Sequence, residues 1–144
     1  MKSKNLIIAF LSLMFFSLRS YAHNEADPIK EVKKVAEAFI KVVDKHNASE
    51  LKALLHPNMV QFVRMGEKLI PMTADAYIQM TVDKKIGGIP RKITHKSANI
   101  IRGETADVVL KAVSEEYDFM YQLSLAKNGN DWVIVGILVD ILKV

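Results

Sequence analysis

Hydrophobic and polar positions alternate most regularly near the C-terminal end of the chain, in residues 117–127 (YDFMYQLSLAK). In an extended strand, every second side chain points to the same face. The side chains that would share one face are Tyr117, Phe119, Tyr121, Leu123 and Leu125. The Asn128-Gly129 pair that follows is typical of a two-residue hairpin turn, because both residues of that turn need a positive φ. The pattern predicts a strand and a tight turn into residues 131–139.

Neighbouring segments extend this hairpin into a run of four antiparallel strands. Residues 92–102 and 104–114 read as two strands around Gly103. Residues 131–139 (DWVIVGILV) are apolar on both faces. In water, such a strand is stable only when other parts of the protein cover both faces. We therefore expect helices to cover the sheet and the strand at 131–139 to be buried on both sides.

Helical spacing replaces alternation upstream. One apolar stripe, with intervals of three and four residues, consists of Ile29, Val32, Ala36, Phe39, Ile40 and Val43. Asp27 can cap this helix, and Pro28 suits its first position. The pattern predicts a helix over residues 27–46.

Shorter elements fill the middle of the chain. They are expected to be a helix capped by Asn47, with Leu55 on its buried side and His56-Pro57 at its end, strands at 59–64 and 69–72 around a turn at 65–68, and a helix at 74–85 stopped by Gly87-Gly88. This order predicts an α+β fold, in which three helices pack on one face of a strongly bent antiparallel sheet.

Residues 1–22 have the pattern of a signal peptide. Lys2 and Lys4 precede an apolar run at 6–18, which is shorter than the roughly 20 residues that span a bilayer. Ser20-Tyr21-Ala22 places small residues where a signal peptidase reads them. We expect cleavage after Ala22, export to the periplasm or medium, no membrane attachment afterwards, and a single domain at 23–144. A retained anchor is the alternative.

Charge and composition exclude several classes of function. The chain has 20 Lys and Arg against 16 Asp and Glu, and loss of Lys2, Lys4 and Arg19 with the signal leaves 17 basic residues and a net charge of +1. That balance does not favour nucleic acid as a partner. The absence of Cys excludes disulfides and cysteine zinc sites, and the four His lack ligand spacing, so we expect neither metal nor cofactor.

Basic residues are frequent between positions 84 and 102. They are Lys84, Lys85, Arg91, Lys92, Lys96 and Arg102. Because no aromatic residues are interleaved for base stacking, we expect a solvated edge rather than a nucleic-acid surface.

Three short motifs, together with the order of elements, carry a family resemblance. They are Leu54-Leu55-His56-Pro57, Leu123-Ser124-Leu125 and Trp132-Val133-Ile134-Val135. Over residues 28–142 the chain resembles the nuclear transport factor 2-like superfamily, and within it the small exported bacterial proteins called putative lumazine-binding (SnoaL-like). The resemblance implies a cone-shaped α+β fold with a pocket between helices and curved sheet. Tyr121 stands where these proteins usually have an Asp, and Val133 where a Lys is common.

Several side chains are candidates for a site. Those that could line an apolar pocket are Phe39, Tyr77, Met80, Phe119, Tyr121 and Trp132, although all six could simply fill the core. His56 has a near-neutral ordinary pKa and could act as a general acid or base, or could merely end its helix. Asp118 could join Tyr117 and Tyr121 in a cluster like that of ketosteroid isomerases, but alternation places Asp118 on the opposite, solvent-facing side.

These observations favour an exported domain that binds a small apolar or aromatic ligand. We expect a homodimer, with edge strands and the outer sheet face as the partner surface. One alternative is an enzyme of the ketosteroid isomerase, polyketide cyclase or dehydratase type, using the same cavity. Another is a dimeric interaction module whose cavity is filled by its own side chains. The chain contains no catalytic sequence motif.

Overall fold

The computed structural model describes residues 27–144, so the predicted signal peptide lies outside the described residues. The helices are α2 (Pro28–Asp44), α3 (Ala48–Leu54) and α4 (Ala74–Val82). The strands are β1 (Leu55–Met65), β2 (Lys68–Thr73), β3 (Lys92–Ile101), β4 (Thr105–Val113), β5 (Tyr117–Asn128) and β6 (Asp131–Lys143). None of the described helices has the length and hydropathy needed to cross a membrane.

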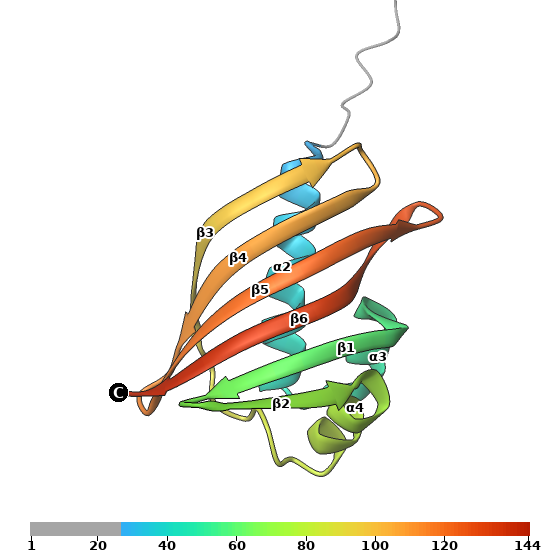
Figure 1. Cartoon of the computed structure of the whole chain (residues 1–144). Coiled ribbons are helices and arrows are strands. Elements are labelled where there is room, and N and C mark those ends of the chain that lie inside the picture. Colours follow the sequence, from blue (N-terminus) through green and yellow to red (C-terminus); the bar gives the residue numbers. More distant parts are fainter. Residues whose placement is uncertain (1–26) are drawn as a thin grey trace, which may run out of the picture.

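The six strands form one open sheet in the order β2-β1-β6-β5-β4-β3 (Figure 1). β3, β4, β5 and β6 are successive antiparallel neighbours, as the alternation and the Asn128-Gly129 turn predict. β1 pairs with β6 in parallel, so the sheet is mixed and the expectation of a fully antiparallel sheet is wrong. The paired residues are far apart in sequence, as Val60 and Gly136 show, and no local turn signal specifies the direction of the pairing.

The three helices lie on one face of this sheet, which confirms the predicted α+β class (Figure 1). Asp27 caps α2, its Oδ1 accepting a hydrogen bond from the Ile29 amide at 3.1 Å. Five of the six residues of the predicted apolar stripe of α2 are buried and face the inward side chains of β4 and β5, whereas Ile29 in the first turn is partly exposed. Completely or almost completely buried in this layer are Val32, Phe39, Ile40, Val108, Leu110, Leu123 and Leu125.

The predicted helices end earlier in the structure than the sequence indicates. The second helix stops at Leu54, and Leu55, His56 and Pro57 belong to β1, whose register against β6 shifts between Leu55 and Val60. An extended residue is what a following proline favours, so His56 enters the strand rather than ending the helix. The helix predicted for 74–85 ends at Val82.

β6 is longer than predicted and is not covered on both sides by the described residues. It continues to Lys143, and its outward side chains Leu138 and Leu142 are 39% and 60% exposed. One apolar face of β6 is therefore part of the outer surface, which no layer of residues 27–144 covers. The expectation that both faces are buried is wrong.

Candidate functional site

A cavity of about 500 Å³ lies between the sheet and the helices. Its walls come from the C-terminal end of α2, from α4 and the loop after it, and from β1, β2, β5 and β6. Ligand pockets of roughly 300–1,000 Å³ are typical of small-molecule sites. The predicted pocket between helices and sheet is therefore present, and the alternative of a cavity filled by its own side chains is wrong.

Most of the cavity lining is apolar. Apolar members from the strands are Val63, Met65, Ile70, Met72, Phe119, Val139 and Ile141. Met65 and Ile89 also line it and are 50% and 53% exposed, so the cavity opens to solvent where the β1–β2 turn meets the loop after α4. A ligand could enter there without rearrangement of the buried core.

A continuous row of five aromatic rings forms the inner wall of the cavity: four of the rings line it, and the fifth, Phe39, supports them. Phe39 is stacked on Tyr77 with 5.9 Å between ring centroids and meets Tyr121 edge-on at 5.8 Å. Tyr121 stacks on Phe119 at 6.0 Å, and Phe119 is followed by Tyr117 at 6.0 Å. Contacts between aromatic rings stabilise particular ring orientations, in addition to the stabilisation that burial of the rings provides. The row therefore provides a preformed surface along one side of the cavity.

The loop between α4 and β3 closes another side, and its glycines explain how it approaches α2. Gly87 and Gly88 have φ of +81° and +85°, which side chains other than glycine rarely adopt. A Cβ on Gly87 would lie 2.0 Å from the Val43 carbonyl oxygen. The Gly88 amide donates to the Asp44 carbonyl at 3.0 Å. The loop is thus held directly against the end of the helix.

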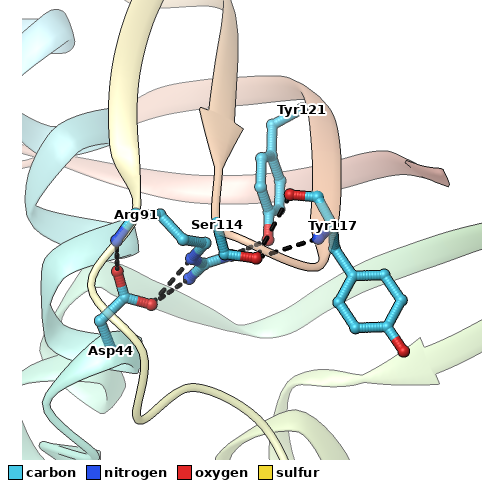
Figure 2. A network of polar contacts seen from close by, with 5 residues as sticks. All are labelled: Asp44, Arg91, Ser114, Tyr117 and Tyr121. Carbon is cyan, nitrogen blue, oxygen red and sulfur yellow. Dashed lines mark hydrogen bonds and ion pairs between the residues drawn. The ribbon is translucent and has the colours of Figure 1, made fainter. Parts of the chain in front are cut away.

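Arg91, at the end of this loop, forms the main polar contact of the cavity. Its Nε donates to Asp44 Oδ1 at 2.8 Å, and its Nη2 lies 2.7 Å from the same oxygen. Its Nη1 donates to the Tyr121 hydroxyl at 2.7 Å. Figure 2 shows the guanidinium between the Asp44 carboxylate and Tyr121, whereas the Tyr117 ring points away from them.

The expectation of a solvated edge is therefore wrong for Arg91, whose side chain is only 6% exposed. A buried charge requires a partner, and Asp44, with 8% of its side chain exposed, provides one. Sequence reasoning missed Asp44 as well. The available signal was its position: a carboxylate in the last turn of a helix is opposed by the helix dipole, so it commonly needs a specific cation.

Two phenols of the inner wall, those of Tyr77 and Tyr121, are kept protonated. Burial raises the pKa of Tyr121, and the nearby Arg91 charge only partly opposes this effect. Burial also raises the pKa of Tyr77, well above its ordinary value. Near neutral pH these hydroxyls are uncharged hydrogen-bonding groups. Asp44 is the one carboxylate of the described lining, and its charge is compensated by Arg91.

Gln61 is a further polar side chain of the cavity lining, and sequence reasoning missed it too. It lines the cavity from β1 and is 3% exposed. Its neighbours at every second position are Met59 and Val63, so strand alternation alone would have placed a polar amide on an otherwise apolar inward face.

The structure separates the predicted site residues into groups. Four of the six predicted pocket residues line the cavity, namely Tyr77, Met80, Phe119 and Tyr121. Phe39 supports the aromatic row from the completely buried layer. Trp132 lies at the opposite end of β6 from the cavity residue Ile141, beneath the Lys127 ammonium at 5.5 Å. Phe39 and Trp132 are thus core residues and do not line this cavity.

The two weak catalytic candidates are outside the cavity. His56 Nδ1 accepts a hydrogen bond from the Asn58 amide at 3.1 Å, which orders the start of β1. Asp118 is on the outer face of β5, where it pairs with Lys111 at 2.6 Å. Neither residue is among those lining the cavity. The acid–phenol cluster of Asp118 with Tyr117 and Tyr121 is therefore not formed, as strand alternation predicts.

Comparisons with known structures agree on the fold. An NTF2-like protein of unknown function from Silicibacter pomeroyi superimposes with a TM-score of 0.72 at 15% identity, covering 81% of this chain and 98% of the other. One from Methylobacillus flagellatus gives 0.67 at 18% identity, covering 82% and 94%. A ketosteroid isomerase-like protein from Erwinia carotovora gives 0.68 at 11% identity, covering 81% and 98%. At these identities the likeness shows the fold alone.

Sequence comparison is more specific. No curated protein matches the chain. The model of the family described as "Putative lumazine-binding" matches residues 27–137, which includes the cavity-lining residues from Val43 to Tyr121. This chain therefore belongs to the family described as "Putative lumazine-binding", and it has the nuclear transport factor 2-like fold.

Proposed function

We propose that this protein binds a small, largely apolar molecule in the cavity between the helices and the sheet. The observation that carries the proposal is the cavity itself: about 500 Å³, apolar over most of its lining, with Asp44, Arg91 and Tyr121 fixed at one side. Apolar walls with a few placed polar groups are typical of ligand sites. The family description names lumazine, which makes lumazine the first compound to test.

Binding rather than acid–base catalysis is favoured by the state of the polar groups. A general base needs a free carboxylate or imidazole within reach of the substrate. The Asp44 carboxylate is engaged by the Arg91 side chain, and its Oδ2 also accepts from the Arg91 amide at 3.2 Å. The described lining therefore offers protonated phenols and a compensated ion pair, which suit orientation of a ligand.

Two neighbouring residues of β2 allow a matched test. Ile70 lines the cavity, whereas Leu69 points to the outer face and is 57% exposed. We expect Ile70→Trp to fill part of the cavity and to weaken binding roughly tenfold, and Leu69→Trp to leave binding unchanged. The probes are lumazine and naphthalene, followed through backbone amide shifts of β1, β2 and residues 83–91. Native mass spectrometry of the protein from its own source would reveal a co-purifying molecule.

The proposal predicts amide shifts with at least one probe, or a co-purifying mass, and weaker binding of the probe in Ile70→Trp alone. The proposal would be contradicted if neither lumazine nor naphthalene shifted the amide resonances and no co-purifying mass was found. Equal weakening of probe binding by Ile70→Trp and Leu69→Trp would also contradict it.

We also propose that a second copy of this chain covers the outer face of β1 and β6. Phe62 and Leu138 are partners in the parallel register and are 40% and 39% exposed. Arg64 and Asp140 are the next outward pair, so the same surface presents both signs of charge beside an apolar centre. A two-fold interface requires such self-complementarity.

Light scattering should give a dimer for the wild type and for Thr94→Glu on β3, but a monomer for Phe62→Glu; a dimeric Phe62→Glu would argue against this surface.

We further propose export, on the basis of the N-terminal pattern of Lys2, Lys4, an apolar run and Ser20-Tyr21-Ala22. Cells producing the full chain should release a form that begins at His23 into the periplasm or medium. Recovery of the intact N-terminus from the membrane fraction would instead support a retained anchor.

A further inference from the structure

The polar side chains that the described fold buries are satisfied to different degrees. Thr81 and Gln61 are the two polar side chains of the described chain that are fully buried within otherwise apolar layers. The Thr81 hydroxyl donates to the Tyr77 carbonyl at 3.1 Å. Gln61 Oε1 is buried and accepts no hydrogen bond from any described residue. A buried acceptor without a hydrogen-bond partner is costly, so the presence of Gln61 at this position calls for a reason.

The position of Gln61 suggests that reason. Its Cα partners are Met72 on β2 and Ile137 on β6, so residues with apolar side chains flank it on both neighbouring strands. It also lines the cavity. A carboxamide has an acceptor oxygen and a donor NH₂ side by side. The complementary group is another amide edge, in which an N–H and a C=O lie next to one another.

Charge in the cavity limits the ligand further. Arg91 is compensated by Asp44, and Lys85, the other cation of the lining, pairs with Asp83 at 3.2 Å and is 65% exposed. Among the described lining residues, both buried charges are therefore paired with each other, although Arg91 Nη2 makes no hydrogen bond. Without a further buried counter-charge, desolvating a charged ligand would be unfavourable.

We propose that Gln61 selects an uncharged ligand that carries a cyclic amide edge, such as a lactam or an imide fused to an apolar ring. The ligand N–H donates to Oε1 of Gln61, and the ligand carbonyl accepts from Nε2. The pairing works for either orientation of the Gln61 amide, because the ligand can turn over with it. This inference rests on the proposed function, since it concerns the same cavity.

Three bicyclic probes of similar shape test the proposal: 2-quinolone, which has the amide edge, quinoline, which has an acceptor alone, and naphthalene, which has neither. We expect the wild type to bind 2-quinolone at least about tenfold more tightly than the other two. Gln61→Met keeps the length of the side chain and removes the amide, so it should abolish that preference while still binding naphthalene. Gln122→Met is the control, because Gln122 lies on the outer, exposed face of β5.

A second readout uses the unaltered protein. The side-chain NH₂ resonances of Gln61 should move downfield on addition of 2-quinolone, as a newly donated hydrogen bond requires, and should show no downfield shift with naphthalene, whether or not the variant folds. Equal binding of all three probes by the wild type would overturn the role of Gln61 but leave the cavity as a binding site. The same conclusion follows if Gln61→Met keeps the preference, because another group would then be selecting the amide edge. Failure of every probe to bind would instead argue against the proposed function itself.

Discussion

Two regions under the same sheet are built in opposite ways. Beneath β4 and β5, α2 packs against the strands without a gap, and Phe39, Ile40, Leu110 and Leu123 are at most 1% exposed. Beneath β1, β2 and the adjoining ends of β5 and β6, the shorter α4 and the loop after it leave a cavity of about 500 Å³. We call these the packed half and the hollow half. The comparison teaches that one apolar sheet face can hold a core and a site side by side.

The two halves are also stabilised differently. The packed half depends on close contact between apolar side chains, which fill the interior at high density. In the hollow half, where side chains leave space, the loop is fixed by directional contacts: Arg91 with Asp44 and Tyr121, and the Gly88 amide with the Asp44 carbonyl. Four changes to the protein test this contrast.

The largest effect is expected when the ion pair of the hollow half is broken. Asp44→Ala leaves the Arg91 guanidinium buried without its counter-charge, which typically costs about 3–5 kcal/mol. The control is Lys111→Ala, which removes the half-exposed Lys111–Asp118 pair of the outer face and should cost less than about 1 kcal/mol. Urea unfolding measures both; similar losses for the two variants would mean that the buried pair does not hold the loop.

The same residue type can be truncated in each half. Ile40→Ala opens a space in the packed half and should lower the free energy of unfolding by about 2–5 kcal/mol. Ile70→Ala enlarges a cavity that already exists, at a residue that is 43% exposed, so we expect a loss of less than about 1 kcal/mol. Chemical denaturation of the two variants decides the matter. Equal losses would show that the hollow half is as tightly packed as the other.

The close approach of the loop to α2 predicts a specific sensitivity at Gly87. Gly87→Ala combines a strained positive φ with a Cβ 2.0 Å from the Val43 carbonyl oxygen, so we expect a loss above about 2 kcal/mol and weaker ligand binding. Gly129→Ala has a positive φ but open space around it, and should cost only the backbone strain of about 1–2 kcal/mol. If thermal unfolding shifts equally in both variants, the contact with Val43 contributes nothing.

The smallest effect concerns acid sensitivity of the packed half. A hydrogen bond from His95 on β3, aided by Lys41, lowers the pKa of Glu37 on α2. Because the folded-state pKa lies below the unfolded value of about 4.3, this interaction stabilises the protein above that pH and is lost as pH falls through the folded-state pKa. Glu37 is partly exposed, so the contribution should stay below about 1 kcal/mol.

Urea midpoints measured between about pH 6 and about pH 3 should therefore fall less steeply for Glu37→Gln than for the wild type. Glu67→Gln, in the exposed β1–β2 turn, serves as the reference. A Glu37→Gln curve that runs parallel to the wild-type curve would argue against the link between α2 and β3.

Local signals specify most of the fold. The stripe of α2, the alternation of β5 and the Asn128-Gly129 turn each act over a few residues, and each predicted element is present. The parallel pairing of β1 with β6 was missed because it depends on where a distant hairpin docks, which no short pattern encodes. The family resemblance supplied the pocket, which periodicity alone does not predict.

The polar part of the site was harder to predict for the same reason. Arg91 looked like one member of a basic surface run, and only the tertiary position of the loop brings it 47 residues back to Asp44. Trp132 was assigned to the pocket by residue type, whereas its place near the β5–β6 turn puts it at the far end of the sheet. Gln61 was missed as well, although its inward direction follows from strand alternation.

The position of β6 has a consequence for how the chain can reach this state. β6 comes last among the six strands in sequence, yet it lies between β1 and β5 and joins them. During synthesis, the β1–β2 hairpin must therefore wait with its inner edge unpaired until β6 has left the ribosome. A chain shortened before Asp131 would contain two separate sheet fragments rather than one smaller domain, and such open edges attract other chains. Completion of the sheet thus depends on β6, so the two fragments cannot be joined before this strand has been synthesised.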